Sequence, residues 1–174
     1  MTSVLKVTEI QDPTNGNTAL TIDSNGIITR PYVPTFSAYG PASWTQLSSG
    51  TNEYVICGNV QVNNGSHYNA TTGLFTAPIA GYYHFTLNLY AWLQGASQGD
   101  NFNYYGAYIW KNGQALTPSG LYGYVNSGDN DRTDVITATM QLNATDTVGA
   151  RIYANAGDCE WYGTHTVFAG FMIG

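Results

Sequence analysis

The sequence predicts an all-β protein, a β-sandwich or jelly roll, from three observations. Short runs of alternating apolar and polar residues recur along the chain, Gly- and Asn-rich turns separate them, and no segment has a sustained helical repeat. Many short strands at regular spacing are typical of sandwiches and barrels. A chain of 174 residues can bury about 70% of its unfolded surface, so the fold needs no disulfide or metal to hold it.

The first thirty residues differ from the rest. Three short β-type runs, VLKVTEI, TALTI and GIIT, alternate with the turn clusters QDPTNGN and DSNG. TALTIDSNGIIT is predicted to form a hairpin closed around DSNG, and none of these runs can bury much surface alone. Two prolines in RPYVP then interrupt regular structure. The sequence therefore predicts an N-terminal segment of residues 1–31 and a head of residues 32–174.

The clearest strand of the head is YYHFTLNLYAWL, residues 82–93, because its apolar residues recur with a period of two. One face carries Tyr83, Phe85, Leu87, Leu89, Ala91 and Leu93. The opposite face carries Tyr82, His84, Thr86, Asn88, Tyr90 and Trp92. Such alternation predicts an antiparallel strand with one face in the core and the other at the surface.

Later segments complete the predicted sandwich. DVITATMQL and TVGARIYA alternate in the same way, and HTVFAGFMI is apolar on both faces, which predicts a central strand. AYIWKNGQAL places Asn-Gly between two runs, the strongest short hairpin signal. The stretches 94–105 and 118–133 lack a clear pattern and are predicted to be long surface loops.

Charge and composition exclude several classes of function. The net charge is −6, and the five basic residues are scattered, whereas nucleic acids and anionic membranes need clustered cations. No apolar run is long enough for a membrane span, and the N-terminus does not resemble a signal peptide, so we expect synthesis in the cytosol. Cys57 and Cys159 lie far apart in the sequence. Reduced, partly buried thiols fit that compartment better, and a structural disulfide between the two is the alternative.

Five segments together resemble the globular head of complement C1q, of the C1q and tumour-necrosis-factor superfamily. They are FSAYG, NNGSHYNATTGLFTAPIAGYYHFTL, YIWKNGQAL, MQLNATDTVGARI and the closing TVFAGFMIG, in the family's order from Phe36 to the C-terminus. The resemblance implies a ten-stranded jelly roll without enzymatic activity. The residues expected to determine this fold are Gly73, Phe75, Gly81, Tyr83, Phe85, Phe168, Gly170 and Phe171.

The same resemblance implies a tight homotrimer. The sequence holds more aromatic residues than one small core needs, and surplus aromatics on sheet surfaces are typical of interfaces. The candidates for the trimer interface are Tyr82, His84, Tyr90 and Trp92 on the outward face of residues 82–93. The alternative is that some of these rings cap the ends of the sandwich.

Residues 1–31 resemble the leader of virion proteins from tailed bacteriophages, with a Lys-Val start, an Ala-Leu-Thr-Ile-Asp-Ser segment and a proline before the head. The resemblance implies attachment to other virion proteins or a short stalk. It predicts a tail or capsid fibre, assembled in the bacterial cytoplasm, whose head attaches to the host surface. A capsid decoration or cement protein that only stabilises the particle is the alternative, and a polysaccharide depolymerase is a distant third.

No catalytic residue and no cofactor are predicted, because HExxH and nucleotide-binding motifs are absent from the sequence. Asp129, Asp131 and Asp134 are weak candidates for a calcium site, and a solvated acidic loop that includes Arg132 is the favoured alternative. Tyr- and Asn-rich stretches suit glycan or protein recognition. The candidate receptor contacts are Tyr104, Tyr105, Tyr122 and Tyr124, with packing between subunits as the alternative.

Overall fold

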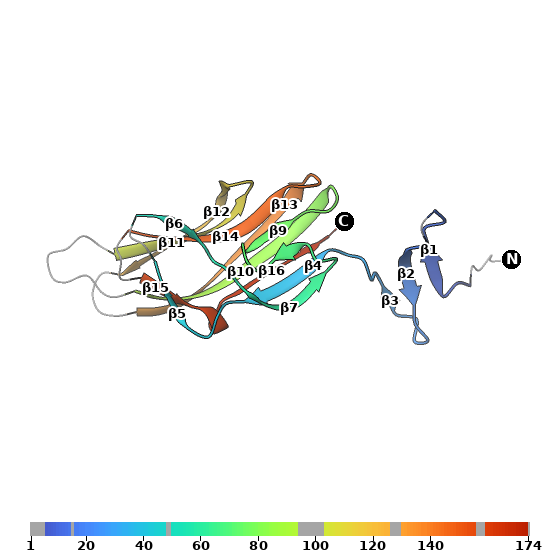
Figure 1. Cartoon of the computed structure of the whole chain (residues 1–174), viewed down its shortest axis with the longest axis horizontal. Helices are drawn as coiled ribbons and strands as arrows, with labels where there is room; N and C mark the ends of the chain where they lie inside the picture. Colours follow the sequence, from blue (N-terminus) through green and yellow to red (C-terminus); the bar gives the residue numbers. More distant parts are fainter. Residues whose placement is uncertain are drawn as a thin grey trace. The chain divides into compact units, whose positions relative to one another are not determined.

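The computed structural model describes residues 6–14, 16–47, 50–93, 103–125, 130–155 and 159–173, with the backbone alone at 93, 103, 116–125 and 130 (Figure 1). The chain divides into two compact units, residues 1–33 and 34–174. Each unit is an antiparallel β-structure, and among the described residues the one helical element is a short 3-10 turn, Gly163–His165. No helix in this part of the chain is long and apolar enough to cross a membrane.

The N-terminal unit is a three-stranded sheet in the order β1-β2-β3. Its strands are β1 (Glu9–Gln11), β2 (Thr18–Ile22) and β3 (Ile28–Thr29). The predicted hairpin is confirmed: Ile22 pairs with Ile28, and the Asp23 carboxylate accepts hydrogen bonds from the backbone N–H groups of Asn25 and Ile27, both at 2.8 Å. This small sheet leaves Ile27 and Ile28 more than half exposed, so it buries little apolar surface of its own.

The head is the predicted sandwich of two antiparallel sheets (Figure 1). The first sheet runs β5 (Trp44–Gln46), β15 (Cys159–Tyr162), β10 (Gly81–Leu93), β16 (Val167–Met172), β4 (Thr35–Tyr39) and β7 (Asn59–Asn64), and β13 (Asn130–Leu142) pairs with β10. The second sheet runs β12 (Gln114–Val125), β11 (Asn103–Lys111), β14 (Thr147–Ala154), β9 (Leu74–Thr76) and β8 (Tyr68–Asn69), and β6 (Asn52–Tyr54) pairs with β14.

Two sequence-based predictions of strand arrangement are confirmed. The closing strand β16 is central, because it pairs with β10 on one side and β4 on the other. The Asn112-Gly113 turn joins β11 to β12 with φ values of 49° and 76°, and Lys111 pairs with Gln114 across it. Two consecutive positive φ angles are the signature of a type I′ hairpin turn, which explains the Asn-Gly pair.

The core between the sheets is a cluster of aromatic rings from both layers. The Phe36 ring lies 5.1 Å from Phe168, 5.3 Å from Phe75 and 4.5 Å from Tyr68, measured between centroids. The predicted inward residues Phe75, Tyr83, Phe85 and Phe168 are all fully buried. Large rings at these contacts bury the most area per residue, so the head is stabilised chiefly by this cluster.

Glycines play three different roles among the predicted fold-determining positions. Gly73 has φ +70°, a left-handed backbone conformation that favours glycine at this turn. Gly170 lies under the rings of Phe85 and Phe36, and a Cβ there would collide with both. Gly81 is the first residue of β10, opposite Leu142.

Two predictions need correction. The loops expected over residues 94–105 and 118–133 are partly strand: β11 starts at Asn103, β12 extends to Val125 and β13 starts at Asn130, and the remaining residues lie outside the described ranges. Phe171 is not in the core, because it is 46% exposed on the face of β16 opposite Phe168 and Gly170. The predicted jelly roll is present as thirteen described strand segments, β4 to β16, several of which last only two to four residues.

Candidate interaction face of the head

The outward face of the first sheet displays the side chains that β10 does not bury. Along β10, Tyr83 to Ala91 alternate between fully buried and partly exposed positions, as predicted. The four predicted trimer-interface residues, Tyr82, His84, Tyr90 and Trp92, all lie on the outward face. Tyr82 and Tyr90 are eight residues apart, which is about 26 Å along a strand, so they belong to opposite ends of this face.

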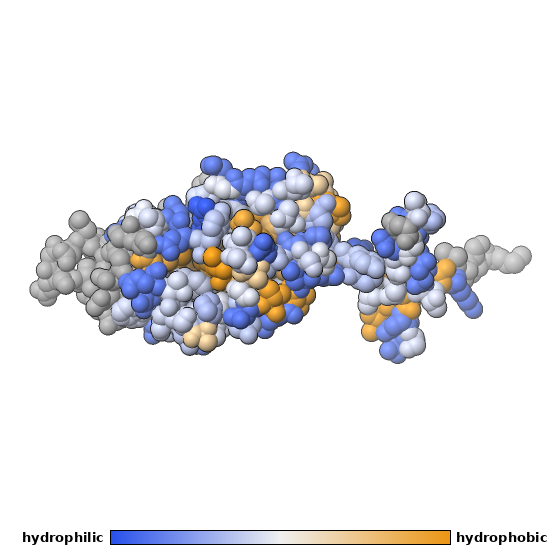
Figure 2. All heavy atoms as spheres, viewed as in Figure 1, coloured by the Kyte–Doolittle hydropathy of each residue, from blue (hydrophilic) through white to orange (hydrophobic). Residues whose placement is uncertain are grey.

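The apolar end of the face consists of Tyr82, His84, Phe171 and Ile173. Tyr82 is 54% exposed, and the Phe171 ring lies 5.6 Å from the His84 ring. The backbone N–H of Ile173 donates to the Tyr82 carbonyl at 2.8 Å, which places this end beside the C-terminus. Figure 2 shows hydrophobic residues at the surface where the head carries the C-terminus. None of the four residues is acidic or a permanent cation.

The aromatic end consists of Trp44, Tyr90, Tyr162 and His165, from β5, β10, β15 and the 3-10 turn. The Trp44 ring lies 5.0 Å from Tyr162 and 5.5 Å from Tyr90, and the His165 ring lies 5.1 Å from Tyr162 and 5.2 Å from Tyr90. Trp44 is 41% exposed, and the other three side chains are partly exposed or exposed. The four rings therefore form one continuous aromatic surface across the sheet.

Two carboxylates adjoin the aromatic end. In the sheet, Trp92 pairs with Glu160 on one side and with Asp131 on the other. Burial raises the pKa of the Tyr90 hydroxyl, and the negative charge of Asp131, which accepts a hydrogen bond from that hydroxyl, raises the pKa further. Asp131 thus joins the ring cluster as a hydrogen-bond acceptor.

The acidic cluster proposed for calcium does not converge in the described residues. Asp131 lies on the outward face of β13, whereas the Asp134 carboxylate accepts a hydrogen bond from the buried Tyr105 hydroxyl and lies 3.9 Å from the Arg132 Nε. Burial raises the pKa of Asp134. Asp129 lies outside the described residues, within which no group of three metal-ligating side chains is present. The calcium site stays a prediction without geometric support.

The four candidate receptor tyrosines differ in burial and in the direction of their side chains. Tyr105 is fully buried, so its prediction as a receptor contact is wrong: strand alternation turns it into the sandwich, where it binds Asp134. Tyr104 points the other way, and its ring lies 5.8 Å from Tyr153. Tyr122 and Tyr124 lie on β12 opposite Gly106 and Tyr104, and their side chains are outside the described set. For these three, receptor contact stays a prediction.

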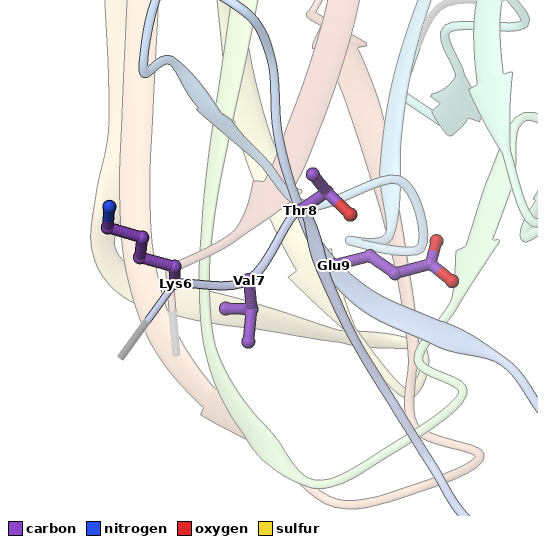
Figure 3. A pocket seen from close by; sticks show the side chains of 4 residues that line it. All are labelled: Lys6, Val7, Thr8 and Glu9. Atoms are coloured by element: carbon purple, nitrogen blue, oxygen red, sulfur yellow. The ribbon is translucent and has the colours of Figure 1, made fainter. Parts of the chain in front are cut away.

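Two surface hollows are weaker candidates for a functional site than the outward face of the first sheet. One is lined by Lys6, Val7, Thr8 and Glu9, and in Figure 3 the Lys6 and Glu9 side chains point away from each other, so no polar groups converge. The other, of about 520 Å³, lies in the head. Its lining residues are Pro41, Thr45, Glu53, Tyr54, Ile56, Gly58, Asn59 and Trp161.

Sequence reasoning missed Trp44, Tyr162 and His165. Trp44 and Tyr162 belong to β5 and β15, strands of three and four residues, and runs that short show no usable alternation. Their contact with Tyr90 depends on the pairing of β5 with β15 and of β15 with β10. The one available signal is the run of aromatic residues in EWYGTH, residues 160–165.

Both cysteines are buried and free, so the described structure contains no disulfide between them. Burial raises the pKa of the Cys57 and Cys159 thiols to about 12. Because only the thiolate is a good nucleophile, both thiols should be inert in the folded head.

We expect the native protein at pH 8 to react with a thiol-specific aromatic disulfide at less than about one hundredth of the rate in denaturant, where two thiols per chain become labelled. A thiol pKa raised by folding favours the native state below the unfolded pKa near 9, and this contribution is lost as the pH rises through 12. Thermal stability should therefore fall above pH 9, and less steeply in a Cys57→Ala, Cys159→Ala variant. Rapid native labelling would contradict the expected burial.

The fold defines a class, a two-sheet jelly-roll head. The C1q domain matches residues 36–173. The chain belongs to the C1q domain family, whose members are generally non-enzymatic binding modules and typically trimerise.

Two known proteins show the extent of the similarity. The chain is 29% identical over 134 residues to mouse complement C1q tumor necrosis factor-related protein 3, a match that covers 76% of this chain and 49% of that protein. The chain thus spans about half the length of this curated relative. The globular domain of a zebrafish complement 1qA protein is similar in structure, with a TM-score of 0.56 and 18% identity, over 82% of this chain and 98% of that one.

Proposed function

We propose that the protein is a bacteriophage virion component, a trimeric fibre or appendage on tail or capsid whose C1q head attaches to the host surface. The apolar end supports the proposed trimer, because Tyr82 and Phe171 are each about half exposed there. Large, uncharged apolar patches on a protein surface are typical of interaction sites. Burying this end in a neighbouring head would remove both rings from water.

The position of the apolar end also supports a shared stalk. The chain enters the head at Pro34, whose carbonyl accepts a hydrogen bond from the Met172 backbone N–H at 3.0 Å, one residue from Phe171. A trimer formed through this end would bring three copies of the chain entry close together. The N-terminal sheet of two- to five-residue strands is too small to be stable alone, and it would gain partners from the other chains or from a virion protein.

Sedimentation equilibrium of the purified protein is the first test, and we expect the mass of three chains, with a stable monomer contradicting the trimer. The virion role is tested separately by expressing the protein without residues 1–33 during infection. We expect the shortened protein to be absent from purified particles. Incorporation at the normal level would contradict attachment through the N-terminal segment. Electron microscopy of labelled particles would distinguish a projecting head from one buried against capsid neighbours.

A further inference from the structure

We propose that the aromatic end, Trp44, Tyr90, Tyr162 and His165, is a binding platform for a neutral saccharide. Saccharide rings pack their C–H groups on the electron-rich faces of aromatic side chains, and their hydroxyls donate to nearby carboxylates. The inference rests on the attachment role proposed above and names the ligand class and the residues. The expected contact with the host is therefore on the outward face of the first sheet rather than on the Tyr-rich stretches of residues 94–105 and 118–133.

The structure holds these rings in place before any ligand binds. The Tyr90 backbone N–H donates to the hydroxyl of Thr166 at 3.1 Å, and Thr166 is fully buried. Trp44 and Tyr162 are paired neighbours across β5 and β15, and the Asn88 side-chain amide donates to the His165 carbonyl at 3.4 Å. A preorganised platform loses little conformational entropy on binding, which favours recognition of a polar ligand.

The charges around the aromatic end select the kind of saccharide. Asp131 and Glu160 adjoin the rings, and they can accept hydrogen bonds from hydroxyl groups. The three basic residues of the head are engaged elsewhere: Lys111 pairs with Asp146, Arg132 with Asp134, and Arg151 lies between the rings of Tyr54 and Trp110. A uronic acid or sialic acid would therefore meet negative charge without a compensating lysine or arginine of the head, so a neutral glycan is favoured.

The same carboxylates argue against a subunit contact at this end. Interface centres are depleted of charged residues, and like charges brought together across an interface oppose association. A three-fold contact here would bring together three copies of both Asp131 and Glu160, whereas the apolar end contributes no carboxylate. The two ends of the face therefore have separate roles, with subunits meeting at the apolar end.

The test titrates the full-length protein with maltohexaose, cellohexaose and a mannohexaose, and with a galacturonate hexamer as the acidic comparator, and follows tryptophan fluorescence. We expect saturable binding of at least one neutral probe, at least tenfold weaker binding of the acidic one, and at least tenfold weaker binding of that neutral probe by Trp44→Ala. Tyr32→Ala, which removes an exposed ring in the N-terminal unit of residues 1–33, is the matched control and should bind normally.

A second variant, Asp131→Asn, keeps every ring and should weaken neutral binding about threefold to tenfold while relieving the discrimination against galacturonate. Absence of saturation by every neutral probe at 10 mM, preference for the acidic probe, or equal binding by Trp44→Ala would each overturn the proposal. Conversion of Trp44→Ala to monomers in sedimentation would overturn it too, because the aromatic end would then be the subunit interface.

Adsorption of particles to host cells separates this inference from the attachment role. Inhibition of adsorption by the bound oligosaccharide, and its loss in Trp44→Ala particles, would support both. Binding in solution with unaffected adsorption would leave the saccharide site standing and contradict the attachment role. Head-dependent adsorption that is unchanged in Trp44→Ala particles would contradict the saccharide site alone.

Discussion

Replacing both Tyr82 and Phe171 by lysine is expected to dissociate the proposed trimer into folded monomers. Both side chains are exposed on the outward face, so neither change removes a contact from the buried core. At an interface centre, loss of a buried aromatic residue costs about 2 kcal/mol or more in binding free energy. The variant also places ammonium groups in an apolar contact at every subunit boundary, where desolvation adds to the cost.

Sedimentation velocity at micromolar concentration measures this effect directly, and circular dichroism reports whether the sheets persist. Gln114→Lys, Ala144→Lys is the matched control, because it adds the same charge at exposed positions on the hairpins at the β11–β12 and β13–β14 turns. We expect the control to sediment as the unmodified protein does. A Tyr82→Lys, Phe171→Lys variant that stays trimeric would show that the subunits meet elsewhere.

The fold followed from the sequence because its strongest signals are local. The alternation of residues 82–93, the Asn-Gly turn at 112–113 and the positive φ of Gly73 each depend on neighbours in the chain, and each is present in the structure. Alternation also placed Tyr82, His84, Tyr90 and Trp92 on the outward face. Phe171 was expected to determine the fold only from the family resemblance, because a strand that is apolar on both faces carries no signal to say which face is buried.

The candidate site was harder to predict because it depends on contacts between distant strands. Trp44, Tyr90 and Tyr162 come together only through the pairing of β5, β15 and β10, which sequence spacing does not encode. Tyr105 was assigned to a loop by composition, although its strand places it in the sandwich and gives its hydroxyl a partly buried carboxylate, that of Asp134. Asp131 and Asp134 lie on opposite faces of β13 for the same reason, because β13 begins at Asn130, inside a segment that was predicted to be a loop.

Gly170→Ala is expected to destabilise the head by about 2–3 kcal/mol, because the added methyl group overpacks a close-packed core. Its Cβ would collide with the rings of Phe85 and Phe36, which are themselves held by Phe75 and Phe168. For a chain of this size, that change lowers the melting temperature by about 5–10 °C. Gly58→Ala is the matched control and should be near neutral, since its Cβ would meet one backbone oxygen at an ordinary 3.7 Å.

A double-mutant cycle with Phe85→Leu distinguishes collision with that ring from a general loss of backbone freedom. Phe85→Leu alone should destabilise the head because it shortens a fully buried ring. In the Gly170→Ala background it should cost at least about 1 kcal/mol less, because the smaller side chain leaves room for the methyl group. All variants are compared by denaturant unfolding at one protein concentration, so that association contributes equally. Strict additivity of the two changes would show that the close approach of β16 to Phe85 does not require glycine at position 170.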